Sequence, residues 1–98
     1  MSKTYVVDID GVVATIVKEL DYSKARPIEE NIKKFNRLYD EGNKIIYFTA
    51  RGSLTGIDWS DVTKKQFNKW GVKYHELRFG KPAADYYVDD KLINVEEI

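Results

Sequence analysis

Two aspartates separated by one residue are the first residues in this chain whose spacing suggests chemistry. The apolar run Tyr5-Val6-Val7 leads into Asp8 and Asp10, and Gly11 follows at once. Burial disfavours a charged carboxylate, so an acidic pair at the end of a buried strand needs a partner, and a bound cation is the usual one. Gly11 permits a sharp turn whose N–H groups can face an anion. The pattern indicates a site for a metal ion and a phosphate, and an acidic turn after an edge strand is the alternative.

Three later apolar runs also end in polar side chains. Thr49 and Arg51 follow the second run, Lys81 stands between glycine and proline after the third, and Asp89-Asp90 follows the fourth. Right-handed crossovers bring the carboxyl ends of parallel strands to one edge of a sheet, where open α/β sheets bind ligands. We therefore expect these groups to converge with the first aspartate pair.

Hydrophobic spacing predicts the elements that must position these groups. Continuous apolar runs are typical of strands buried on both faces of a parallel sheet, whereas helical spacing bounded by proline or acidic residues and glycine indicates helices. The predicted strands are residues 5–7, 44–49, 72–79 and 86–88. The predicted helices run from residues 26–27 to Gly42 and from residues 58–60 to Gly71, with an irregular flap over residues 12–20 and a short closing helix or turn over residues 92–98.

The composition limits the classes of protein to which this sequence can belong. Its 98 residues predict a single domain, residues 1–98, and its 16 basic and 16 acidic residues leave no excess charge for wrapping nucleic acid. The absence of cysteine excludes disulfides, zinc–thiolate sites and cysteine nucleophiles, and it fits a reducing compartment. No signal peptide is apparent, and no apolar stretch approaches the ~20 residues that span a bilayer. We expect a cytoplasmic protein with no membrane partner.

The histidine and the tryptophans have structural readings. His75 is the one histidine, so a Ser-His-Asp triad is not expected, and we interpret His75 as structural with substrate contact as the alternative. Trp59 and Trp70 fall on the apolar side of the second predicted helix, which predicts a packing role. Trp59 lies beside the loop that leaves the predicted site, so a role as a ligand platform stays open for it.

The four polar strand ends also resemble a known family. The segments are Asp8-Ile9-Asp10-Gly11-Val12, Ile45-Ile46-Tyr47-Phe48-Thr49, Lys81 and Val88-Asp89-Asp90. In this order they resemble the motifs of the haloacid dehalogenase superfamily, in its phosphatase branch, and the likeness runs from about residue 4 to residue 91. It implies a three-layer, Rossmann-like α/β fold with an open parallel sheet of about four strands in the order 3-2-1-4, helices on both faces and a short flap after the first strand.

The intervals between these motifs leave no room for the cap domain that larger relatives carry. The segments Phe48–Gly52 and Gly80–Asp85 resemble those of small bacterial proteins labelled polysaccharide or capsule biosynthesis phosphatases. This likeness implies a small phosphorylated sugar or polyol as substrate. It also implies that a capless member shields its site by forming a homo-oligomer or by accepting a large substrate.

The family likeness implies Mg²⁺-dependent hydrolysis of a phosphomonoester through an aspartyl-phosphate intermediate. Asp8 would be the nucleophile, and Asp10 the general acid and base. Mg²⁺ would be held by Asp8, by the backbone carbonyl of Asp10 and by Asp90, while Asp89 would orient the site. The choice between Asp89 and Asp90 as the direct metal ligand stays open.

The phosphoryl group would be bound by residues at the same strand ends. Thr49 would donate a hydrogen bond to a phosphoryl oxygen, together with the backbone N–H groups of Ile9, Asp10, Gly11 and Ala50. Lys81 would offset the negative charge of the nucleophile and the phosphoryl group. Arg51 has two readings, a contact with the phosphate or leaving group and a surface salt bridge.

Three other readings compete with a sugar or polyol phosphatase. A phosphorelay receiver domain also combines aspartates, threonine and lysine, but there the adjacent acidic pair ends the first strand, whereas here it comes last. A non-catalytic phosphate-binding module and a phosphatase of nucleotides or nucleic-acid ends both stay open, although the neutral charge argues against long polyanions. The sequence has neither a GxxxxGK[ST] phosphate loop nor a GxGxxG dinucleotide motif.

Overall fold

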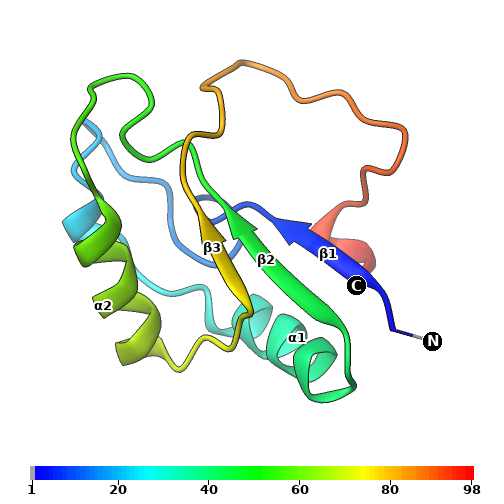
Figure 1. Cartoon of the computed structure of the whole chain (residues 1–98). Helices are drawn as coiled ribbons and strands as arrows, with labels where there is room; N and C mark the ends of the chain where they lie inside the picture. Colours follow the sequence, from blue (N-terminus) through cyan, green and yellow to red (C-terminus); the bar gives the residue numbers. More distant parts are fainter. Residues whose placement is uncertain (1) are drawn as a thin grey trace.

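A three-stranded parallel sheet and two helices form the framework of the chain (Figure 1). The structure, a computed structural model, describes residues 2–98. The strands are β1 (Thr4–Val7), β2 (Lys44–Phe48) and β3 (Glu76–Arg78), and the sheet order β1-β2-β3 places β2 in the centre. The helices are α1 (Glu29–Asp40) and α2 (Ser60–Trp70), with short 3-10 turns η1 (Tyr22–Lys24) and η2 (Val95–Glu97). The predicted α/β class with a parallel sheet is confirmed.

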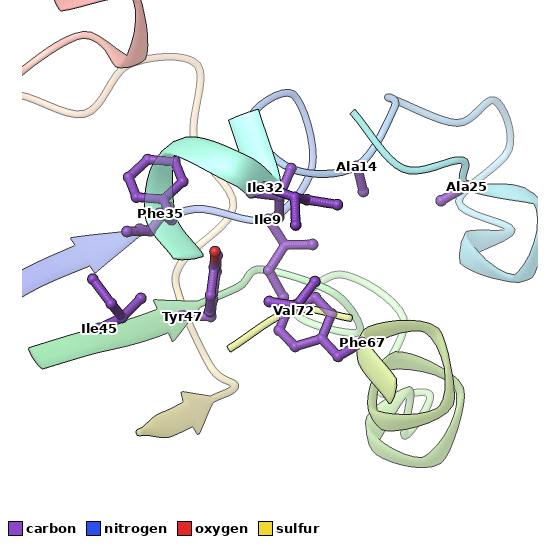
Figure 2. Close-up of a cluster of buried hydrophobic side chains, with 11 residues drawn as sticks. Ile9, Ala14, Ala25, Ile32, Phe35, Ile45, Tyr47, Phe67 and Val72 are labelled. Carbon is purple, nitrogen blue, oxygen red and sulfur yellow. The ribbon is translucent and has the colours of Figure 1, made fainter. Parts of the chain in front are cut away.

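The core lies between one face of the sheet and both helices. The register pairs Tyr5 with Ile45 and Val7 with Tyr47, so these side chains share one face of the sheet. Buried residues of α1 and α2 pack against this face in a single cluster, which Figure 2 shows in close-up. The cluster includes Val7, Ile9, Val13, Ile32, Phe35, Ile45, Tyr47, Phe67 and Val72. Burial of these apolar surfaces fixes the sheet edge from which the functional groups project.

The opposite face of the sheet is open at β1, which corrects the expectation of burial on both faces for that strand. For the central strand β2 the expectation holds, because Ile46, on the same face as Val6, is only 6% exposed. Val6 itself is 64% exposed, and charged side chains of β2 and β3 cover part of the remaining surface. The Lys44 ammonium lies 2.8 Å from Glu76, which Arg78 also pairs. Hydrogen bonds from these two cations lower the pKa of Glu76 to about 2. Among the described residues the helices therefore form one layer and the sheet a second.

The strand expected over Tyr86–Val88 does not form. Tyr86 is 86% exposed, Val88 is 97% exposed, and the segment has no strand pairing. The hydrogen bond that its side chains form is local: the Tyr87 hydroxyl donates to the carbonyl of Pro82, five residues earlier. Within residues 2–98, β1 pairs only with β2, and the chain after β3 arches away from the sheet before returning to η2 beside β1 (Figure 1).

Helix and strand ends differ from the predicted ones for local reasons. Pro27 does not start α1, because Pro27 bridges to Ala14 and the Ile28 amide donates to Val13 over 2.9 Å, so both residues belong to the loop. Helix α1 begins at Glu29, whose charge favours the positive end of the helix dipole. The third strand is shorter than the predicted range 72–79 and covers only three residues. None of the helices in residues 2–98 is long and apolar enough to cross a membrane.

The Tyr47 hydroxyl is buried without a hydrogen-bond partner within residues 2–98. Its ring packs against Phe35 and Phe67, and the oxygen sits among carbon atoms in Figure 2. Burial raises the pKa of this phenol. We expect Tyr47→Phe to raise the free energy of unfolding by about 1 kcal/mol, because an unsatisfied polar group is removed while the ring is kept. Urea denaturation measures the change, and Tyr86→Phe at an exposed site serves as the neutral control. A destabilised Tyr47→Phe protein would contradict this account.

Candidate active site

The turn after β1 is held by a buried isoleucine. Ile9 is fully buried in the core, so its neighbours Asp8 and Asp10 lie outside the cluster that Ile9 joins (Figure 2). The carbonyl of Ile9 accepts hydrogen bonds from the amides of the three residues 12–14. Gly11 closes the turn with φ +88°, a left-handed conformation that favours glycine. Packing therefore fixes the positions of both carboxylates before any ligand binds.

Asp8 and Lys81 form the centre of the candidate site. The Lys81 ammonium lies 3.2 Å from Asp8 Oδ2, and the other oxygen of Asp8 accepts from the Ile9 amide over 2.8 Å. Side-chain exposure is 16% for Lys81 and 35% for Asp8, so the pair is reached by solvent from the Asp8 side. The backbone of Lys81 donates to the carbonyl of Thr49 over 3.1 Å. The predicted convergence of the ends of β1 and β2 with the segment after β3 is thus present.

Arg51 forms a salt bridge, as one of its two readings predicted, but the pair is with Asp10 and the arginine is buried rather than at the surface. Its side chain is 0% exposed, and its Nε and Nη2 donate to the two oxygens of Asp10 over 3.1 and 2.9 Å. The guanidinium is therefore neither on the surface nor free for a phosphate. A bidentate guanidinium–carboxylate pair fixes both the position and the plane of the acid. Arg51 positions Asp10.

Helix α2 and the turn η1 hold Arg51 in turn. Arg51 Nη1 donates to Thr63 over 2.9 Å and to Gln66 over 2.7 Å. The amide nitrogen of Gln66 then donates to the backbone carbonyl of Tyr22 over 2.7 Å, which ties η1 to α2. The guanidinium carbon also lies 5.0 Å from the centre of the Tyr22 ring. Partial burial, and after it the charge of Asp10, raises the pKa of Tyr22.

Thr49 and the backbone amides are already engaged inside the protein. Thr49 is fully buried, and its hydroxyl oxygen accepts from the Arg51 amide over 3.1 Å, which leaves its own proton to donate. The Ile9 amide donates to Asp8, and the Gly11 amide donates to the carbonyl of Ala14 over 2.7 Å. The predicted use of these two amides for phosphate therefore requires their present bonds to be exchanged. Ala50, half-buried beside Thr49, stays a predicted contact.

The structure does not bring Asp89 and Asp90 to Asp8. Both residues are exposed in the segment after β3, and Asp89 accepts a hydrogen bond from the Lys91 amide over 2.8 Å. That bond, together with one from Asp90, holds the pKa of Asp89 below its usual value. Nowhere in residues 2–98 do three carboxylate, histidine or cysteine side chains gather as a metal-binding group. In this arrangement the donors do not fit the octahedral oxygen shell of Mg²⁺.

Two aromatic residues with uncertain roles in the sequence now have defined surroundings. The Ile45 amide lies 3.1 Å from His75 Nδ1, and the ring of Tyr39 stacks on the imidazole at 4.5 Å, so His75 is structural. Trp59 precedes α2 and meets the ring of Tyr22 edge to face at 5.3 Å. Trp59 is therefore linked to Asp10 by successive contacts through Tyr22 and Arg51.

Sequence reasoning missed the residues that support Arg51. Thr63 is a buried polar residue, and Gln66 stands three residues later on α2. Two polar residues at this spacing lie on one side of a helix. In the sequence, that spacing together with an arginine directly after a strand was the feature that indicated a buried polar network. Tyr22 gave no comparable sign, since it lies in an irregular segment.

Comparison with known proteins shows a shared fold. No family model matches the sequence, and no curated protein matches it. Five chains of solved structures match. The crystal structure of a structural-genomics target from Vibrio cholerae is 26% identical, with a TM-score of 0.86, and the match covers 99% of this chain and 86% of that one.

Two further matches come from structures of the Pnkp1/Rnl/Hen1 complex, one of them described as an RNA repair complex. Both are 16% identical, with TM-scores of 0.68 and 0.65, and they cover 92% and 88% of this chain. The chain spans only 31% and 28% of those larger chains. At this level of identity the likeness concerns the backbone fold alone, so these comparisons establish the architecture around Asp8 and leave its chemistry to the residues themselves.

Proposed function

We propose that this protein is a phosphomonoester hydrolase in which Asp8 accepts the phosphoryl group. The observation that carries the proposal is the 3.2 Å pair between Asp8 and Lys81 at the carboxyl edge of the parallel sheet. In the first step an Asp8 oxygen attacks phosphorus, the bond to the leaving oxygen breaks, and that oxygen takes a proton. In the second step water attacks the phosphorus of the aspartyl phosphate, which releases phosphate and restores Asp8.

Lys81 serves both steps through its charge. The ammonium lies where the anionic oxygens of the phosphoryl group would meet the anionic nucleophile, so it offsets their repulsion. The ring of Tyr87 lies 4.0 Å from this ammonium and contributes a cation–π contact to its placement. The Thr49 hydroxyl, one strand along, retains a proton for a phosphoryl oxygen.

Asp10 is the acid and base of the proposal. It gives a proton to the leaving oxygen in the first step and takes one from the attacking water in the second. Each carboxylate oxygen has two lone-pair directions, and Arg51 uses one on each oxygen, so a direction remains on both. Arg51 thus orients Asp10 without occupying it fully.

The proposal includes Mg²⁺ and a finer version of the fold. For Asp89 or Asp90 to reach Asp8, the segment Tyr86–Val88 would have to pair along the free edge of β1, which gives the sheet order 3-2-1-4 and lets the end of the chain cover the open face. Asp8 and one of the two later aspartates would then supply the carboxylate oxygens that Mg²⁺ prefers. In the arrangement that residues 2–98 adopt, three such ligands do not lie together.

A phosphate-release screen tests the function. The substrates are a hexose 6-phosphate, an inositol monophosphate, glycerol phosphate and a nucleoside monophosphate, each with Mg²⁺ and with a chelator. We expect release from at least one monoester with Mg²⁺ and little with the chelator. Release that does not depend on Mg²⁺ would remove the metal from the proposal. Phosphate binding without release would instead support the non-catalytic module, and preference for the nucleotide would support the nucleotide phosphatase.

A further inference from the structure

A small pocket lies beside Arg51, between the loops that follow β2 and β3. It has a volume of about 190 Å³ and is lined by Arg51, Ser53, Ile57, Asp58, Trp59 and Phe79, with two glycines completing its wall. Arg51 belongs both to this pocket and to the ion pair with Asp10. The pocket therefore lies next to the residue that positions the proposed acid, Asp10.

The pocket is also close to the phosphoryl site on its other side. The Ser53 hydroxyl donates to the backbone carbonyl of Lys81 over 2.7 Å, and the Lys81 ammonium contacts Asp8. A substrate with its phosphorus at Asp8 and its leaving oxygen at Asp10 would therefore have this pocket within reach of the rest of the leaving group. Nothing in the proposed phosphoryl transfer uses Trp59, Phe79 or Asp58.

The lining combines apolar rings with acceptors for hydroxyl groups. Trp59 and Phe79 offer aromatic surface, and Tyr22 holds the Trp59 ring edge to face. Asp58 Oδ1 accepts from the Ser60 amide over 2.9 Å, and the carboxylate is exposed to solvent. Hydrogen bonds from Ser60 hold the pKa of Asp58 below its usual value, so it is an ionised acceptor at neutral pH. A carboxylate accepts hydrogen bonds from hydroxyls and repels a second phosphate.

We propose that this pocket binds the ring of the leaving group, and that the ring is a single hydroxylated one, as in a hexose, a cyclitol or a ribose. The inference rests on the proposed phosphatase function and names its substrate class. Aromatic surface suits the C–H faces of such a ring, and Asp58 and Ser53 suit its hydroxyls. A volume of about 190 Å³ suits one such ring.

Binding tests this assignment without any turnover. The chain has two tryptophans, so Trp70→Phe leaves Trp59 as the sole tryptophan and Trp59→Phe leaves Trp70 as the matched control. Each single-tryptophan protein is titrated with a hexose 6-phosphate, an inositol monophosphate, a nucleoside monophosphate and glycerol phosphate. In the Trp70→Phe protein we expect a saturable fluorescence change with the three phosphates that carry a hydroxylated ring and none with glycerol phosphate. In the Trp59→Phe protein we expect no change with any of the four. No change with any ring phosphate, or an equal change with glycerol phosphate, would overturn the pocket assignment.

Kinetics separates the failure of this inference from failure of the function. In Trp59→Leu we expect the ratio of kcat/KM for the hexose phosphate to kcat/KM for glycerol phosphate to fall about tenfold, mainly through KM. Trp70→Phe keeps the parental ratio. An unchanged ratio in Trp59→Leu with phosphate release intact overturns the pocket and leaves the phosphatase standing. A Trp59 fluorescence response in a protein that releases no phosphate leaves the ring site and removes the hydrolase.

Discussion

Asp8→Asn is expected to reduce phosphate release by about a thousandfold or more, the loss typical of removing a covalent nucleophile. The amide has nearly the shape of the carboxylate, so Ile9 remains buried and the turn keeps its geometry. It is a far weaker nucleophile than the carboxylate and cannot form the aspartyl phosphate. The measurement is the initial rate of phosphate release at saturating substrate, together with mass spectrometry of the quenched protein, which should show the phosphoryl adduct in the parent and not in Asp8→Asn.

The matched control for this change is Asp85→Asn, at an exposed aspartate outside the site. It changes the net charge by the same amount and should keep the parental rate. If Asp8→Asn retained the parental rate, or if the adduct formed on it, Asp8 would not be the nucleophile. The Asp8–Lys81 pair would then be a structural ion pair, and the proposed function would lose the observation that carries it.

Arg51→Met is expected to lower the free energy of unfolding by about 3 kcal/mol, which for a chain of this size lowers Tm by roughly 12–24 °C. The substitution leaves the carboxylate of Asp10, whose side chain is only 20% exposed, without its partner. It also removes hydrogen bonds to Thr63 and Gln66. The cost stays at the lower end for a broken buried pair because Asp10 keeps some contact with water.

Thermal unfolding of Arg51→Met and of Lys73→Met measures this difference. Lys73 pairs with Asp40 over 2.8 Å, but both side chains are about half exposed, so removing that pair should cost under about 1 kcal/mol. The double variant Asp10→Asn with Arg51→Met should recover part of the loss, since no uncompensated charge remains. Equal Tm changes in the Arg51 and Lys73 variants would show that the Asp10–Arg51 pair contributes little to stability.

The parts of this molecule that sequence predicted are those that depend on local pattern. The apolar runs before Asp8 and Thr49 gave β1 and β2, and the helical spacing gave α1 and α2, because side-chain period reports which face is buried. Convergence of Asp8 with Lys81 followed from the parallel topology, and it is present. Both depend on chain geometry that neighbouring residues largely determine.

The rest depends on partners that lie far apart in the sequence. Arg51 follows the end of a strand, a position typical of a surface arginine. It is buried because Asp10, Thr63 and Gln66, which are distant in sequence, lie around it and accept its hydrogen bonds. Tyr86–Val88 has the composition of a strand, but a strand needs an edge to pair with, and in the structure the Tyr87 hydroxyl instead donates to Pro82 in the preceding loop. The separation of Asp89 and Asp90 from Asp8 follows from that one pairing choice.

The single amide of Gln66 bears on how this protein could acquire a new substrate preference. The amide oxygen of Gln66 accepts from the Arg51 guanidinium, which orients Asp10, and its amide nitrogen donates to the backbone carbonyl of Tyr22. Exchanges that shift Tyr22 would therefore disturb proton transfer as well as recognition. Ile57 and Phe79 line the pocket that contains Trp59, and within residues 2–98 neither has a side chain that can hydrogen-bond to Gln66 or Arg51. Laboratory evolution should therefore accumulate its specificity changes at these two positions first.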